Sequence, residues 1–214
     1  MESLTETIAS RSLDRSIEER RASYVEEIKG IVEATYRVIE RTGEFDPKLR
    51  EILRESHTST QAFYKHFRSK DELLLLLLDD GRRQLLGYLS HRMDKATTPA
   101  GRIRAWIEGV LAQASDVKAA ARTRPFLANR DRLADQFPRE QQTSVDLLVD
   151  LLAEAIGRLP GRRKREADAR RDAEAIYDVT FGALHRYLTH GTKPTAGQID
   201  HLVRFNLAAV NGKV

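Results

Sequence analysis

The chain has 214 residues, 41% hydrophobic and 32% charged, so it is long enough to bury a sizeable core and has the balance of a globular protein. It contains no cysteine, which excludes disulfides, thiolate zinc sites and iron–sulfur clusters, and its formal net charge is only +4. The longest leucine run, Leu73 to Leu78, ends at two aspartates, and no apolar signal segment opens the chain. We therefore expect a cytoplasmic protein without a membrane partner.

The first part of the chain predicts an arm followed by a long helix. Residues 1–22 alternate arginine with glutamate and lack a sustained apolar stripe, which indicates a mobile or partly helical arm. From about Tyr24 to Arg41 the apolar residues recur at helical spacing, and Gly43 stands just past the end. We expect the first packed helix over that span.

Two short helices separated by a turn follow. Asp46 suits the N-cap of the first and Pro47 its first turn, and residues 55–58 form the predicted turn. Ser59 is the expected cap of the second short helix, and Ser69 and Glu72 fit a capping box at the start of a long helix from Lys70 to Met93. The order is that of a helix-turn-helix.

The second short helix has two different faces. Phe63 and Phe67, at i and i+4, can anchor it to a core, whereas Gln61, Tyr64 and Lys65 share the other edge. Residues 56–70 contain three basic and no acidic residues, so positive charge is concentrated there. An exposed helix of this chemistry fits the DNA major groove, where an amide such as that of Gln61 pairs with adenine.

The rest of the chain indicates further amphipathic helices and no strand. The leucine run is apolar on every side, which predicts burial all round. Pro99 opens a helix with apolar residues at helical spacing, Pro125 and Pro138 punctuate short helices, and longer helices are expected at about 142–158, 167–189 and 196–211. The fold class is therefore predicted to be all-α.

The string Phe63-Tyr64-Lys65-His66-Phe67-Arg68-Ser69-Lys70-Asp71-Glu72-Leu73, in its place after a helix-turn-helix, resembles the DNA-binding domain of the TetR family of one-component repressors. The resemblance covers about Tyr24 to Leu78. After the arm at 1–22, it implies a DNA-binding domain at 23–70 and a ligand-binding and dimerisation domain at 71–214. It also implies a homodimer that binds near-palindromic operator DNA and responds to a small-molecule effector.

Residue roles follow from the resemblance and from side-chain chemistry together. Thr60 and Gln61 are expected to read bases, and Tyr64, Lys65 and Lys70 to contact phosphates. The full set of expected DNA-binding residues is Ser59, Thr60, Gln61, Tyr64, Lys65, His66 and Lys70.

Two positions depart from the family pattern. The turn usually carries glycine where His57 stands, and a histidine at positive φ is strained. Asp46 and Pro47 replace a common threonine, and the Asp46 carboxylate would repel a nearby phosphate.

The residues expected to bind the effector or to form the dimer interface could instead have purely structural roles. Three apolar residues and one arginine could line a ligand pocket, although Trp106 and Val110 suit a core equally well and Arg122 suits a surface ion pair. The set is Trp106, Val110, Arg122 and Phe126. The apolar stripes of the two long helices suit either a four-helix dimer interface or a single-chain core, and the expected interface is Leu148, Leu151, Leu152, Ala155, Val179, Ala183 and Tyr187.

Other function classes have weaker support. His185 and His190 are five residues apart, which is poor helical spacing for metal ligands, so neither metal nor cofactor is expected. The basic run at 158–165 is interpreted as a solvated loop, with a nucleic-acid tract as the alternative. The sequence contains no catalytic motif. A helical ligand-binding or interaction module that has lost operator binding is the alternative to a regulator.

Overall fold

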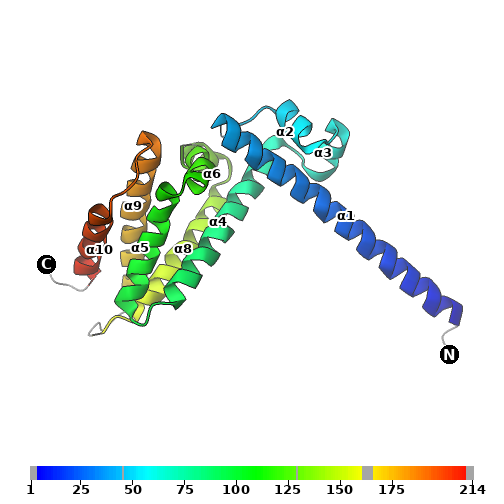
Figure 1. Cartoon of the computed structure of the whole chain (residues 1–214). Coiled ribbons are helices and arrows are strands. Elements are labelled where there is room, and N and C mark those ends of the chain that lie inside the picture. The colour runs from blue at the N-terminus through cyan, green and yellow to red at the C-terminus, as the bar shows by residue number, and fades with distance from the viewer. Residues whose placement is uncertain (1–3, 45, 129, 161–165, 211–214) are drawn as a thin grey trace. The chain divides into compact units, whose positions relative to one another are not determined.

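The computed structural model describes residues 4–44, 46–128, 130–160 and 166–210, which form helices and short connections without a strand. The predicted all-α fold is confirmed (Figure 1). The helices are α1 Leu4–Thr42, α2 Leu49–Ser56, α3 Thr60–His66, α4 Lys70–Asp94, α5 Pro99–Ser115, α6 Val117–Ala128, α7 Arg130–Gln136, α8 Pro138–Gly157, α9 Glu166–His190 and α10 Ala196–Val210.

The chain divides into two compact units. Unit 1 consists of residues 1–42 and 46–73, and unit 2 of residues 43–45 and 74–214, so the division falls within α4 between Leu73 and Leu74. Among the described residues, none of the helices is both long and apolar enough to cross a membrane.

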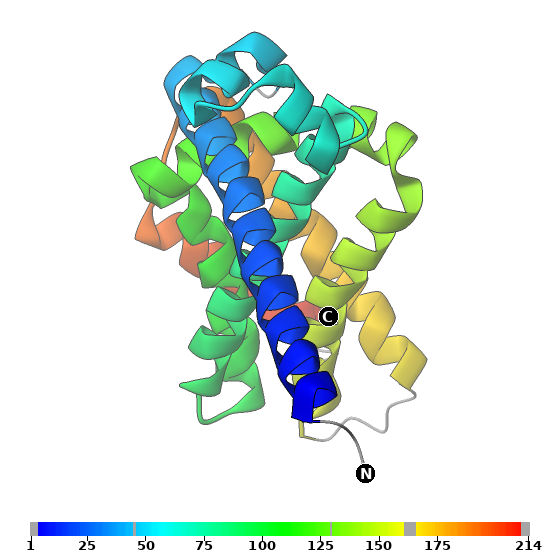
Figure 2. The ribbon, with the colours of Figure 1, turned by 90° about the vertical axis from the view of Figure 1, so that its right-hand side faces the viewer.

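In unit 1, α1 is longer than predicted. It runs without a break from Leu4 to Thr42, so the segment expected as a mobile or partly helical arm is helical from Leu4 on (Figures 1 and 2). The sequence has no proline in this stretch and its first glycine is Gly30, so nothing interrupts the helix. Leu13 and Ile17 are exposed, which agrees with the absence of a packed apolar stripe there.

The core of unit 1 joins α1, α2 and α3 through aliphatic and aromatic side chains. The residues buried in it include Ile31, Val38, Ile39, Ile52, Phe63, Phe67 and Leu73. The predicted anchoring roles of Phe63 and Phe67 are confirmed, since neither is exposed by more than 4%.

The predicted start of the second helix was wrong. α2 begins at Leu49 with Lys48 as its N-cap and no side-chain cap, so Asp46 and Pro47 precede the helix. The Asp46 carboxylate instead lies 2.5 Å from Lys70 Nζ, and a partner of opposite charge is a stronger attraction than backbone N–H groups two residues away.

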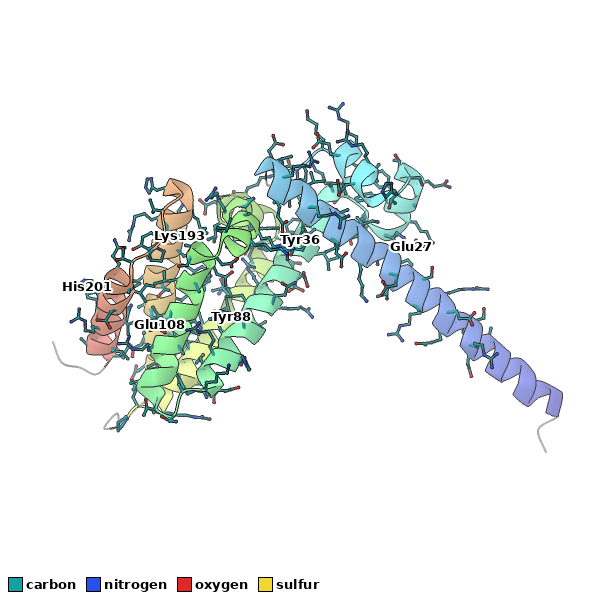
Figure 3. All side chains as sticks on the ribbon, viewed as in Figure 1. Glu27, Tyr36, Tyr88, Glu108, Lys193 and His201 are labelled. Atoms are coloured by element: carbon teal, nitrogen blue, oxygen red, sulfur yellow. The ribbon has the colours of Figure 1, made fainter. Side chains whose placement is uncertain are left out.

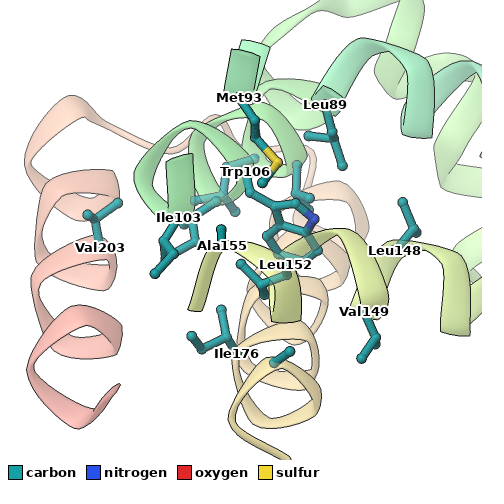
Figure 4. Packing of buried hydrophobic residues seen from close by; sticks show 14 of the residues in the cluster. Leu89, Met93, Ile103, Trp106, Leu148, Val149, Leu152, Ala155, Ile176 and Val203 are labelled. Carbon is teal, nitrogen blue, oxygen red and sulfur yellow. The ribbon is translucent and has the colours of Figure 1, made fainter. Parts of the chain in front are cut away.

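Unit 2 is built around α5, which packs against α6, α8, α9 and α10. Trp106 lies at the centre of the buried cluster, with Met93 and Leu152 close by (Figure 4). Thr98 caps α5 by accepting from Gly101 N–H, and the apolar residues predicted for its inner face are all buried: Ile103, Trp106, Ile107, Val110 and Leu111.

Three other expectations for this part of the chain need correction or fall outside the described residues. Leu76 is 39% exposed, so the leucine run is not covered on every side. Pro125 lies inside α6, and Pro138 begins α8, which therefore starts before the expected position of about 142. Residues 161–165 of the basic run and the expected helix end at Asn211 lie outside the described residues.

Candidate nucleic-acid interface

The turn between α2 and α3 has the backbone conformation that favours glycine, but it carries histidine. His57 has φ 54° and ψ 32°, in the left-handed region, and the following N–H of Thr58 donates to Leu53 O at 3.0 Å. The bond satisfies a carbonyl at the end of α2 and turns the chain toward Ser59. For a residue with a Cβ, the left-handed backbone conformation costs roughly 1–2 kcal/mol of free energy relative to the right-handed one.

α3 begins at the predicted cap and presents a polar face. Ser59 Oγ accepts from Ala62 N–H at 3.1 Å. The side chains on the other side from the buried phenylalanines are exposed, and these are Thr60, Gln61, Tyr64 and Lys65. Their amide, hydroxyl and ammonium groups can donate to base edges or to phosphate oxygens.

α1 holds the end of α3 through Glu27, which is labelled in Figure 3. His66 Nε2 lies 2.6 Å from Glu27 Oε2, and its ring packs edge-on against Tyr24 at 4.5 Å between centroids. The His66 side chain is fully buried. The expectation that His66 contacts DNA was therefore wrong, because its ring packs inside the protein.

Glu27 also lies near Lys65, whose Nζ is 3.8 Å away and 5.9 Å from the centre of the Tyr24 ring. The hydrogen bond with His66, and then the charge of Lys65, lower the pKa of Glu27 below its ordinary value. A carboxylate thus stands beside a lysine expected to contact phosphate. Neither Tyr24 nor Glu27 was predicted as part of this site, because Glu27 and His66 are 39 residues apart and no local pattern links them.

The start of α4 carries the predicted capping box. Ser69 Oγ accepts from Glu72 N–H at 3.1 Å, and Glu72 Oε2 accepts from Arg68 N–H at 2.5 Å, one residue before the cap. Lys70 is held by Asp46 at 2.5 Å and donates to Pro47 O at 3.3 Å. Lys70 is one of the residues expected to contact phosphate, and its positive charge is therefore already balanced by the Asp46 carboxylate.

The predicted effector residues lie in unit 2. Trp106 and Val110 are fully buried, Phe126 is nearly so, and Arg122 is partly exposed. The Trp106 ring lies 6.4 Å from that of Tyr177 and 6.3 Å from that of Phe181, two aromatic residues of α9 not selected from the sequence.

The predicted interface residues differ in accessibility. Four belong to the core of their own chain, which leaves no surface for a partner: Leu148, Leu152, Ala155 and Ala183. Leu151 and Tyr187 are partly buried, and Val179 is exposed. Among the described residues, no group of three or more histidine, aspartate or glutamate side chains is placed to hold a metal ion.

Comparisons with known proteins agree with the geometry of unit 1. Residues 31–77 match the family model described as bacterial regulatory proteins, tetR family. No curated protein sequence matches the chain.

Solved structures of the same fold include transcription regulators. A TetR transcription regulator from Haloarcula marismortui is 17% identical with a TM-score of 0.66, over 88% of this chain and 98% of that one. The fatty acid degradation regulator FadR from Bacillus halodurans is 17% identical with a TM-score of 0.66, over 85% and 94%. FadR from Bacillus subtilis, in complex with stearoyl-CoA, is 14% identical with a TM-score of 0.56, over 86% and 95%.

Proposed function

We propose that this chain is a ligand-responsive transcriptional repressor of the TetR family, not an enzyme, and that it binds a near-palindromic operator as a homodimer. The observation that carries the proposal is the polar face of α3. Thr60, Gln61, Tyr64 and Lys65 are exposed together on one short helix, which two buried phenylalanines fix in place.

In this proposal the residues of the interface have distinct roles. Thr60 and Gln61, in the first turn of α3, read base edges in the major groove, as the N-terminal residues of a recognition helix do. Tyr64 and Lys65 donate to phosphates. Ser59 fixes the start of the helix through its cap, and Lys70 contacts a phosphate only when it leaves Asp46.

Dimerisation would place two copies of α3 in successive major grooves, with half-site centres about 34–36 Å apart or a multiple of it. Leu147 of α8 and Val179 of α9 are exposed apolar side chains on two helices that pack against each other. Together with Leu151 and Tyr187, they form the proposed interface.

A small effector, apolar or amphipathic, would release the operator by binding one conformer of the regulator more tightly than the other. Unit 2 supports this role because its interior combines a large apolar cluster with the aromatic group of Trp106, Tyr177 and Phe181. That one protein of this fold is described in complex with stearoyl-CoA is consistent with such an effector.

Selection of binding sites from a pool of random duplex DNA tests the proposal. We expect an inverted repeat to be recovered at moderate salt. Gln61→Ala should relax base preference and cost about 1–3 kcal/mol of binding free energy. Lys65→Ala should weaken binding to all DNA sequences alike and reduce the salt dependence of the affinity. Recovery of no inverted repeat would overturn the proposal and favour a ligand-binding module without an operator.

A further inference from the structure

Unit 2 contains buried hydrogen-bond donors that lack an acceptor. Within the described residues, the buried side-chain atoms without a hydrogen-bond partner include Arg82 Nη1, Trp106 Nε1 and Gln141 Nε2. Trp106 is fully buried and Gln141 is 8% exposed. A buried donor without an acceptor costs about 1–3 kcal/mol, so these three, of five unpartnered buried side-chain atoms that the structure describes in unit 2, need a physical explanation.

These three donors are connected through direct neighbours. Arg82 Nη2 donates to Gln141 Oε1, which links α4 to α8. Tyr177 of α9 is near enough to Arg82 to influence its charge, and its ring lies 6.4 Å from that of Trp106 on α5. The residues that carry the three donors are therefore linked across α4, α5, α8 and α9.

The charge of Arg82 is also poorly compensated. Burial lowers the pKa of Arg82, and the opposing influence of Tyr177 and Asp79 is smaller. Asp79, the acidic residue whose charge opposes this lowering, pairs with Arg83 at 2.8 Å. No ion pair of Arg82 occurs among the residues that the structure describes.

The missing partner can be deduced from these groups. All three unpartnered atoms are donors, so they call for acceptor oxygens, and the uncompensated guanidinium calls for negative charge. The neighbouring side chains are aromatic or aliphatic, and Tyr177 and Phe181, stacked at 4.3 Å, are only partly buried. An apolar body could therefore lie along them while its head meets Arg82 and Gln141.

We propose that unit 2 binds an amphiphile with one anionic head group, whose oxygens are bound by Arg82 and Gln141 and whose apolar tail lies along Trp106, Tyr177 and Phe181. The inference deepens the proposed function, on which it rests for the role of this compound as the effector. Carboxylate and phosphate heads share the required chemistry.

The test uses four ten-carbon probes below their critical micelle concentrations: decanoate, decyl phosphate, decanol and decyltrimethylammonium. Trp106 is the only tryptophan of the chain, so its fluorescence reports binding in this region without DNA, and a rise in Tm provides a second readout. We expect at least one of the two anions to change both readouts, and the stronger of them identifies the head group. Decanol and the cation should bind at least about tenfold more weakly.

Neighbouring residues supply matched controls. Arg82→Met should weaken anion binding about tenfold or more, whereas Arg83→Met, at the exposed next position, should not. Gln141→Glu should also weaken it, because a carboxylate would repel the head, whereas Gln142→Glu at an exposed site should not. Arg82→Lys keeps the charge without the forked geometry and should give an intermediate affinity.

Three results would overturn the inference: decanol binding as tightly as the anions, equal affinities for the variants at positions 82 and 83, or no response to either anion up to its solubility limit. Because the titration contains no DNA, these results are independent of operator binding. Anion binding that left an operator complex intact would support the site and count against the proposed effector control.

Discussion

The contact between Asp46 and Lys70 makes a prediction at the scale of a single residue. The carboxylate neutralises Lys70 at 2.5 Å, next to the proposed phosphate contacts. Asp46→Asn should free the ammonium group and remove a negative charge near the DNA backbone. We expect tighter operator binding and a steeper dependence of affinity on salt, by about one more phosphate contact. Fluorescence anisotropy at several salt concentrations measures both.

Asp178→Asn provides the control for net charge, because Asp178 is exposed on α9 and outside unit 1. It changes the charge of the chain by the same amount. Equal effects of the two substitutions would show that the pairing of Asp46 with Lys70 has no local influence on DNA binding.

His57 makes a prediction about stability. Its left-handed backbone conformation strains any residue with a Cβ, and glycine removes that strain at some cost in unfolded-chain entropy. We expect His57→Gly to raise the free energy of unfolding by about 1 kcal/mol. His57→Ala keeps the Cβ and should give no such gain in urea unfolding. Equal stabilities of the glycine and alanine variants would argue against strain at this turn.

Glu27 should make the stability of unit 1 depend on acid pH. Its pKa is lowered in the folded protein, first by the hydrogen bond with His66. A lowered carboxyl pKa contributes stability above the unfolded value, near 4.5, and that contribution is lost as pH falls through the folded value. The difference in Tm between the wild type and Glu27→Gln should therefore shrink on acidification below about pH 4.5. A constant difference across that range would exclude a contribution from the ionised carboxylate.

At the scale of the element, α3 depends on its anchors, because a helix of seven residues is not stable alone. Phe63 is fully buried, so Phe63→Ala should cost about 3–5 kcal/mol of stability and abolish operator binding through loss of the fold. Tyr64 is 54% exposed, and Tyr64→Ala should cost about 1 kcal/mol or less while still weakening DNA binding. Thermal unfolding and anisotropy together separate the two roles. If Tyr64→Ala weakened operator binding only as much as its loss of stability explains, the proposed phosphate contact of Tyr64 would be contradicted.

Elements were predictable where the signal is local. Ser59, Ser69 and Pro99 mark helix starts because caps and first-turn prolines act within three or four residues, and the faces of α3 follow from the helical period. The partners of Lys70 and His66 were not predictable, since Asp46 and Glu27 are brought to them only by the packing of α1, α2 and α3. The same limit applies to α8 and α9. Their apolar stripes predicted burial but could not show whether the residues are covered by their own chain or by a partner.

At the scale of the whole molecule, the proposed dimer can be tested at its exposed apolar residues. Val179 and Leu147 stand on the two packed helices α8 and α9, and placing a charge there would bury it without a partner in a dimer. Because Val179 is exposed in the single chain, Val179→Asp should leave the fold intact while converting the dimer to a monomer. A monomer engages one half-site and loses the advantage of linked binding, so operator affinity should fall about 10²- to 10⁴-fold.

Sedimentation velocity measures the association state, and anisotropy measures the affinity. Val117→Asp is the matched control, because Val117 is 73% exposed on α6 and an aspartate suits the start of that helix. A Val179→Asp protein that remains dimeric would move the interface away from the exposed side of α9. The wild type could instead prove to be a monomer at concentrations that saturate an inverted repeat. Each half-site would then be bound independently, and dimerisation would no longer be part of the proposed function.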